Sequence, residues 1–393
     1  MASGWKIPHL PDDIVESILL ELPVKSLLRF KSSCKSWCCS INDPDFTKSH
    51  LHKSSADISL QKVLFVTFEK FSPFTILSND KIGSAEASLT VDSKVMLLDP
   101  PIQGFLNDIS AGLKVSSCNG LVFIKNDTSM MLWNPAIRKY KLIPSYNMPS
   151  LFWTYSLFGI AYDSLAEDYK VVHVKVIDES HQNHIVEIFS AINQSWRMME
   201  DSRVPVGFRS MYQHPVSLSG TVNLIVRGND SECFVMSLDL SDEKFIVTPA
   251  PIKDGSWSSW RLCTFANHVC TSRTLKGKFS IWELEKNAET GLLTWINIIK
   301  LLTPGSLIQK SPQGLVDFIY VKENGNILWR NFSTEHGCFI GFIEYDVRRK
   351  EFNEFKPELE ISMNIHLPLL HVESLASPAI ILVPAGFRRL KGN

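Results

Sequence analysis

The first forty residues carry apolar side chains at helical spacing. Pro11 is followed by two aspartates and then by apolar residues three or four positions apart, up to Pro23. This pattern predicts a helix with acids in its first turn, which Pro23 ends while opening a second helix. Apolar residues from Cys34 to Ile41 repeat the spacing and predict a third helix, and the sequence NDPDF at 42–46 breaks the pattern.

This segment is too apolar for three short helices to cover by themselves. Half of the residues from 10 to 41 are apolar. A unit of fewer than about 40 residues rarely buries enough surface to be stable alone. The surplus apolar surface must therefore meet either the rest of the chain or another protein, and the spacing leaves both possibilities open.

After about residue 55 the pattern changes to short apolar runs separated by polar turns, which is typical of strands. Four segments share one arrangement: a bulky residue, then a small polar or acidic one, and an aromatic seven positions after the first. The pairs are Trp133 and Tyr140, Phe189 and Trp196, Leu238 and Phe245, and Tyr345 and Phe352. A fifth segment has the ends Trp282 and Trp295 around a longer turn. Several units begin with a glycine before an apolar strand, namely Gly120, Gly159, Gly220 and Gly314.

The first residues of these five segments lie 44 to 63 positions apart. A period near 50 with one aromatic-ended hairpin per unit indicates propeller blades, closest to kelch-type spacing. One such unit cannot bury both faces of its sheet, so the units must stack in a ring. We predict an all-β propeller of about six to eight blades, and a β-sandwich or an irregular meander is the alternative. The runs at 62–68 (KVLFVTF) and 379–384 (AIILVP) are candidate strands for closing the ring.

Composition excludes several classes of partner. The 393 residues are 45% hydrophobic with a net charge of −1, which gives no reason to expect nucleic acid or an anionic membrane as a partner. The N-terminus has no apolar core of signal-peptide length, so we expect a cytoplasmic or nuclear protein. Eight cysteines without a C-x-x-C pair predict buried free thiols and no metal site.

Motifs for catalysis are missing from the sequence. The chain has no phosphate-binding loop, no dinucleotide-binding glycine pattern and no nucleophile elbow, and its close histidine or cysteine pairs are too few to ligate a metal. We therefore expect no catalytic residue and no cofactor. Trp257 is a candidate anchor for a bound protein, whereas Trp260 leads into an apolar strand and is expected in the core. A propeller enzyme with an unrelated helical cap is the competing hypothesis.

The N-terminal segment resembles the F-box. The resemblance is carried by the sequences LP at 10–11, LPVKSLLRFK at 22–31 and CKSW at 34–37, although Cys38 stands where the family often has arginine. It implies a small helical module that docks on a Skp-type adaptor, which in turn binds a cullin. By position, the adaptor-facing and packing set is Leu10, Pro11, Ile14, Ile18, Leu22, Pro23, Leu27, Leu28, Cys34 and Trp37. Internal packing is the alternative role for Cys34 and Trp37.

The remaining chain is similar to the F-box-associated region of a large plant group, often described as F-box/kelch-repeat, to which pollen S-locus F-box proteins also belong. The sequences SSCNGLVFI, LWNPAIRKYKLIP and FGIAYDSLAEDYKVV carry this similarity. It implies an α+β multidomain chain with a tail at 1–9, an F-box module at 10–52 and a target-binding propeller at 53–393. It further implies a substrate receptor of a ubiquitin ligase with an unknown target protein. A non-degradative scaffold and an S-locus role in pollen recognition of ribonucleases are the alternatives.

Overall fold

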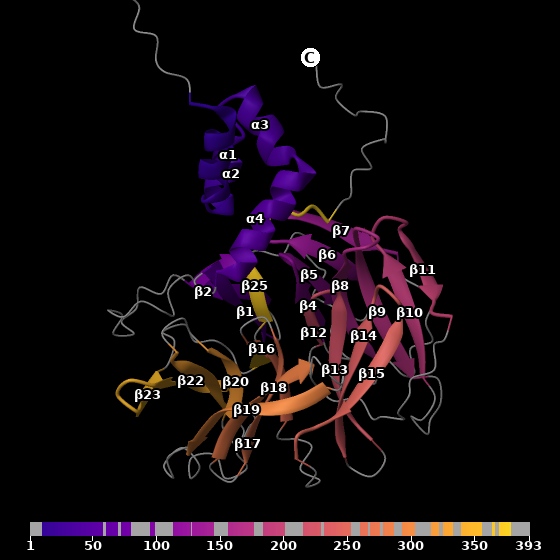
Figure 1. The fold of residues 1–393 in the computed structure, drawn as a ribbon, viewed down its shortest axis with the longest axis vertical. Coiled ribbons are helices and arrows are strands. Elements are labelled where there is room, and N and C mark those ends of the chain that lie inside the picture. The colour runs from indigo at the N-terminus through magenta and orange to yellow at the C-terminus, as the bar shows by residue number, and fades with distance from the viewer. Residues whose placement is uncertain are drawn as a thin grey trace, which may run out of the picture.

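The computed structural model contains a group of helices and a ring of β-sheets beside it (Figure 1). The residues described are 10–57, 60–69, 72–79, 95–98, 113–126, 128–144, 156–176, 184–200, 215–228, 232–252, 260–265, 268–275, 278–286, 293–302, 316–321, 325–332, 339–355, 364–365 and 369–378. The predicted N-terminal tail at 1–9 lies outside them.

Four helices form the N-terminal unit, which we call the helical module. They are α1 (Asp12–Leu20), α2 (Val24–Phe30), α3 (Lys35–Asn42) and α4 (Pro44–Ala56). The first three follow the predicted pattern, and the fourth was missed. The sequence at 42–46 is a helix restart, because the Asp43 carboxylate accepts the Asp45 backbone N–H at 2.8 Å and Pro44 occupies the first helical position.

Six antiparallel sheets follow among the described residues, and we number them as blades in chain order. Blade 1 holds β1 (Gln61–Glu69), β2 (Ser72–Asn79), β3 (Val95–Leu98), β24 (Asn364–Ile365) and β25 (Leu369–Val372). Blade 2 holds β4 (Lys114–Cys118), β5 (Leu121–Lys125), β6 (Met130–Asn134) and β7 (Lys139–Ile143). Blade 3 holds β8 (Leu157–Asp163), β9 (Asp168–Val176), β10 (His184–Ser190) and β11 (Ser195–Met198).

The other three blades have the same four-stranded order. Blade 4 holds β12 (Val216–Leu218), β13 (Thr221–Arg227), β14 (Cys233–Asp239) and β15 (Lys244–Pro249). Blade 5 holds β16 (Trp260–Phe265), β17 (His268–Leu275), β18 (Lys278–Lys286) and β19 (Leu293–Leu302). Blade 6 holds β20 (Val316–Val321), β21 (Ile327–Phe332), β22 (Phe339–Asp346) and β23 (Glu351–Phe355). The predicted propeller is confirmed, at the low end of the expected blade number.

The core lies between neighbouring blades. Phe123 of blade 2 packs against Ile160 and Val171 of blade 3 in one buried cluster, and similar clusters join blades 3 and 4, 4 and 5, and 5 and 6. Trp260 is 1% exposed in the cluster between blades 4 and 5, so its predicted core role is confirmed. These clusters bury the faces that blades 2 to 6 turn toward one another, as stacking in a ring requires.

Strands from both ends of the chain close the ring. β1 pairs with β25 from Gln61 opposite Val372 to Leu64 opposite Leu369, and further along with β24. The apolar run at 62–68 is therefore a closing strand, as predicted. The run at 379–384 lies outside the described residues, and the C-terminal strands that the structure pairs with β1 come from 364–372.

The structure contains the predicted hairpins, and the two residues of each pair lie opposite one another on neighbouring strands. Trp133 lies opposite Tyr140, and the same holds for the other three predicted pairs, Phe189 with Trp196, Leu238 with Phe245 and Tyr345 with Phe352. A fifth pair, Tyr162 opposite Tyr169, was missed. The longer segment is also a hairpin, but its two tryptophans are not opposite one another. Trp282 lies opposite Asn297 and Trp295 opposite Leu284, because the strands β18 and β19 pair two positions away from a Trp282–Trp295 match.

One turn recurs at the ends of these hairpins. A small polar side chain at the end of the first strand accepts backbone N–H groups of the turn, and a residue four positions later has a positive φ. The accepting residues are Asn134, Asp163, Ser190, Asp239 and Asp346. The residues of positive φ are Arg138, Glu167, Gln194, Glu243 and Lys350. The small polar position noted in the sequence is therefore the residue that builds the turn.

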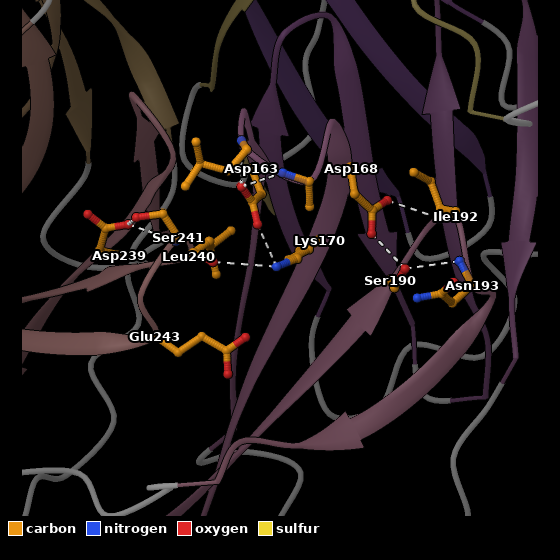
Figure 2. A network of polar contacts seen from close by, with 12 residues as sticks. Asp163, Asp168, Lys170, Ser190, Ile192, Asn193, Asp239, Leu240, Ser241 and Glu243 are labelled. Carbon is orange, nitrogen blue, oxygen red and sulfur yellow. Dashed lines mark hydrogen bonds and ion pairs between the residues drawn. The ribbon is translucent and has the colours of Figure 1, made fainter.

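Polar contacts extend this turn into the neighbouring blade (Figure 2). The Asp163 carboxylate accepts the Leu165 and Ala166 backbone N–H groups and also pairs with the Lys170 ammonium at 2.6 Å. The same ammonium donates to the Leu240 carbonyl of blade 4 at 3.4 Å. Because both charged groups are largely buried, their pairing offsets the cost of taking them out of water.

The segment after β25 lies against blade 2. The Ser374 hydroxyl donates to the Asn119 carbonyl at 2.8 Å, next to Gly120 in the two-residue turn between β4 and β5. Gly120 has a φ of +80°, and a Cβ there would overlap the Ser374 side chain and approach the Val372 carbonyl oxygen to 2.9 Å. The close approach of the two segments therefore depends on the absence of a side chain at 120.

We expect Gly120→Ala to destabilise the ring more than Gly325→Ala. Both glycines have a φ near +80°, but a Cβ at 325 would meet nothing within 4 Å. Gly325→Ala should cost about 1–2 kcal/mol for the left-handed backbone, and Gly120→Ala about 1–3 kcal/mol more for the overlap. Thermal unfolding followed by circular dichroism measures both. Equal losses would show that the segment after β25 does not press on this turn.

A buried histidine makes the ring sensitive to acid. His173 is fully buried, stacks on Phe158 at 4.1 Å between ring centroids and contacts the Glu187 carboxylate through Nδ1 at 2.9 Å. Burial lowers the pKa of His173 below its ordinary value of 6.5, although the hydrogen bond to Glu187 opposes that shift. In the unfolded chain this histidine takes up a proton as the pH falls through about 6.5, whereas in the folded chain it does so only at lower pH. The free energy of unfolding therefore decreases as the pH falls below about 6.5.

We expect the melting temperature of His173→Gln to fall less than that of the parent chain between pH 7 and pH 5. A glutamine amide can still donate to Glu187 but does not titrate. Each unit by which the folded pKa lies below the unfolded one costs up to about 1.4 kcal/mol at low pH. Melting temperatures of both chains across this range test the expectation, and two parallel curves would contradict it.

Candidate functional site: the helical module and its seat on the ring

The first helix presents an apolar ridge to solvent. Pro11 precedes the helix, and the acids Asp12 and Asp13 in its first turn complement the helix dipole. Ile14 and Ile18, one turn apart, are 45% and 50% exposed, and Leu10 just before the helix is 54% exposed. We call Leu10, Ile14 and Ile18 the ridge. Three neighbouring apolar side chains exposed on so short a segment indicate a surface that another protein covers.

The ten residues predicted for the adaptor site divide by burial. Leu10, Pro11, Ile14, Ile18, Pro23 and Cys34 are exposed; Leu22, Leu28 and Trp37 are half-buried; Leu27 is fully buried. The structure thus brings them onto one small module but gives them different tasks. Leu27 belongs to the core of the module together with Leu19 and Ile41.

Trp37 and Cys34 both have internal roles. The Trp37 ring packs edge-on against Phe30 with 5.3 Å between centroids. The Cys34 sulfur accepts the Trp37 backbone N–H at 3.5 Å and so caps α3. The prediction of buried thiols is wrong for Cys34 and Cys39, which are exposed, and right for Cys233, Cys263 and Cys270. Burial raises the pKa of Cys270 to about 12, so this thiol stays protonated.

The core of the helical module is completed by the ring. One cluster contains Leu19, Val24, Leu27, Ile41 and Phe46 of the helices together with Leu375 of the segment after β25. Ala136 and Ile137, from the turn between β6 and β7, pack against the same cluster. The module is therefore seated on the ring through a shared core, with α4 leading directly into blade 1 (Figure 1).

An ion pair lies beside this shared core. Lys48 of α4 pairs with Glu167 in the turn between β8 and β9 of blade 3. The hydrogen bond to Glu167 raises the pKa of Lys48. Both side chains are about half exposed, so the pair contributes little energy. It does show that the module contacts the ends of two blades on one face of the ring.

No group of three or more metal-ligating side chains occurs among the described residues. In the same part of the chain, no helix is long and apolar enough to cross a membrane. Trp257, the predicted protein-binding anchor, lies between β15 and β16 and outside the described residues.

Comparisons with known proteins match both units. Residues 7–49 match the F-box domain, and residues 73–377 match the F-box associated beta propeller domain. The F-box protein At2g07140 and the F-box/kelch-repeat protein At3g44120, both of Arabidopsis thaliana, are each 24% identical over 318 residues, which cover 75% of this chain and 77% of each relative. Among solved structures, a six-bladed propeller lectin from Aleuria aurantia matches with a TM-score of 0.41 and 8% identity, covering 75% of this chain and 90% of the lectin.

Proposed function

Because the chain belongs to the F-box proteins that carry an F-box associated beta propeller domain, we propose that it is the substrate-recognition subunit of a Skp–cullin–F-box ubiquitin ligase. An F-box implies binding to a Skp-type adaptor. The observation that supports the proposal best is the exposed ridge of Leu10, Ile14 and Ile18 on a module whose other large apolar side chains are half-buried or buried.

The ridge is apolar, so covering it with another protein would stabilise a complex. Fully burying one such aliphatic side chain is worth about 1.5–3 kcal/mol, and covering the exposed half of each ridge residue adds roughly half of that. The ridge holds three such side chains between positions 10 and 18. Pro23 and Cys34 are also exposed on this module. The adaptor covers the ridge in our proposal, and the half-buried Leu22, Leu28 and Trp37 pack against the core of the module.

We assign target recognition to the face of the ring opposite the helical module. The module touches short turns of the ring, namely the four-residue turns after Asn134 and Asp163. The connections from one blade to the next leave the opposite face and are longer, for example from Ile143 to Leu157 and from Met198 to Val216. Long loops on a rigid frame are where binding residues usually lie. Trp257 belongs to one of these connections and remains the candidate anchor.

The mechanism is proximity. The helical module holds the chain on the adaptor, and through it on a cullin, while the ring holds a target protein. A target lysine is then presented to a ubiquitin-charged conjugating enzyme at high effective concentration. Proteins of this family are typically non-catalytic ligase subunits, and the proposal asks no residue of this chain to act as nucleophile, acid or base. It places the protein in the cytoplasm or the nucleus, where its targets are degraded.

Co-expression tests the proposal directly. We expect the chain made alone to aggregate or to bind chaperones through the ridge, and co-expression with a Skp-type adaptor to yield a soluble complex that also binds a cullin. Capture from cells treated with a proteasome inhibitor, followed by mass spectrometry, should then identify proteins that are ubiquitinated by the assembled complex. A stable monomer that ignores the adaptor would overturn the proposal, and capture without any turnover would indicate a scaffold.

A further inference from the structure

One side chain, that of Asn134, connects the two parts of the ring on which the helical module packs. Asn134, at the end of β6, is fully buried. Its oxygen accepts the Ala136 N–H at 2.9 Å and the Ile137 N–H at 3.4 Å, which shapes the turn that packs on the helices. Its amide nitrogen donates to the Ser374 carbonyl at 2.9 Å and to the Ala376 carbonyl at 2.7 Å.

These two carbonyls flank Leu375 on either side. Leu375 is the residue of the C-terminal segment that enters the core of the helical module, where it is 8% exposed. Holding the carbonyls on both sides fixes the backbone at Leu375. Asn134 therefore ties together the two parts of the ring that contact the helices, the turn at 135–138 and the segment at 374–376.

Comparison with the equivalent turns explains why this residue is an amide. The same position holds Asp163, Ser190, Asp239 and Asp346 in the other turns, so a carboxylate or a hydroxyl is enough to accept the turn N–H groups. A carboxylate cannot donate, however, and at 134 it would place a negative charge against two carbonyl oxygens. Among these five turns, only the one after Asn134 requires a side chain that accepts from the turn and also donates to two carbonyls.

We infer that Asn134 is a positioning residue that fixes the orientation of the helical module relative to the ring. Its effect on adaptor binding is indirect, since the ridge on α1 is made by other residues. Only the consequence of this inference rests on the proposed function. In a ligase, the orientation of the module determines where a target bound to the ring lies relative to the adaptor.

A zero-length carbodiimide crosslinker, which joins amines to carboxylates in contact, reports this orientation in the full chain co-purified with a Skp-type adaptor. The Lys48–Glu167 pair joins the module to blade 3. Two other exposed pairs serve as internal references, Lys53–Glu21 within the module and Lys244–Asp242 within blade 4. Mass spectrometry of the digested protein gives the yield of each crosslink.

We expect Asn134→Asp to lower the Lys48–Glu167 yield several-fold and to leave both reference yields unchanged. The matched control is Asp346→Asn, the reverse exchange at the same turn position of blade 6, which should change none of the three. Leu375→Ala removes the side chain that enters the module and should lower the same yield, so it decides the question if Asn134→Asp does not fold. Unchanged Lys48–Glu167 yields in the folded variants would overturn the inference.

Adaptor capture forms a separate arm of the experiment. Asn134→Asp should still capture the adaptor, because Leu10, Ile14 and Ile18 are intact. If the parent chain fails to capture any Skp-type adaptor, the proposed function is wrong, while the comparison of crosslink yields in the free chain still tests the role of Asn134.

Discussion

Changing Ile14 and Ile18 together to aspartate will abolish capture of a Skp-type adaptor while the ring stays folded. Each isoleucine is about half exposed in the free chain, so the helical module loses little of its own core. Covering the exposed half of each side chain is worth about 0.7–1.5 kcal/mol, which the complex would lose, and each aspartate would have to be desolvated without a partner. The sum predicts a loss of affinity of at least about a hundredfold, measurable by pull-down or calorimetry.

Ile246→Asp is the matched control for this double change. Ile246 on β15 of blade 4 has the same side chain and a similar exposure, 51%, but lies on the ring. It should leave capture unchanged, as should Lys25→Ala on the exposed side of α2. Replacing Leu10 and Pro11 by alanine should weaken capture, because the first is part of the ridge and the second precedes the helix. Equal capture by all four variants would place the adaptor surface elsewhere.

Ending the chain after Phe355 will open the ring. The truncation removes β24 and β25, which pair with β1, and it removes Leu369 and Leu375 from buried positions. Two buried leucines are worth about 3–6 kcal/mol, which approaches the whole stability of many domains. β1 would also become an unpaired edge that invites aggregation. We expect soluble aggregates by size-exclusion chromatography and loss of a cooperative thermal transition.

A chain that ends after Pro378 is the control for this truncation. It keeps β25, the Asn134 contacts and Leu375 but lacks the apolar run at 379–384. We expect it to melt cooperatively close to the parent. If it aggregates as the shorter chain does, the run at 379–384 has a closing role after all, and pairing between β1 and β25 does not suffice.

Local pattern was enough to predict the blades. The hairpin pairs such as Trp133 with Tyr140 are seven residues apart, and a four-residue turn brings them opposite one another, so spacing alone identifies them. Spacing does not fix the pairing of Trp282 and Trp295, because the turn between them is longer: Trp282 lies opposite Asn297 and Trp295 opposite Leu284. Local pattern also missed α4 because a single capping residue, Asp43, was read as the end of the helical region.

The seat of the helical module could not be predicted in the same way. Asn134 and Ser374 are 240 positions apart, and no local pattern connects them. The F-box resemblance named ten residues of the module, but it could not tell the buried Leu27 from the exposed Ile18, because both fall at helical spacing. One sign was present in the sequence: the turn position that is aspartate or serine in the other hairpins is asparagine at 134.

The pairing of β1 with β25 also sets the order in which a new chain can mature on the ribosome. About 300 residues separate the two strands, and at 5–20 residues per second their synthesis takes roughly 15–60 s. Throughout that time β1 lacks its pairing with β25 and the helices lack Leu375. A nascent or prematurely terminated chain therefore displays an unfinished module and an open sheet edge together, and both are surfaces that chaperones and quality-control proteases recognise. Completion of the last strand is the event that removes both signals at once.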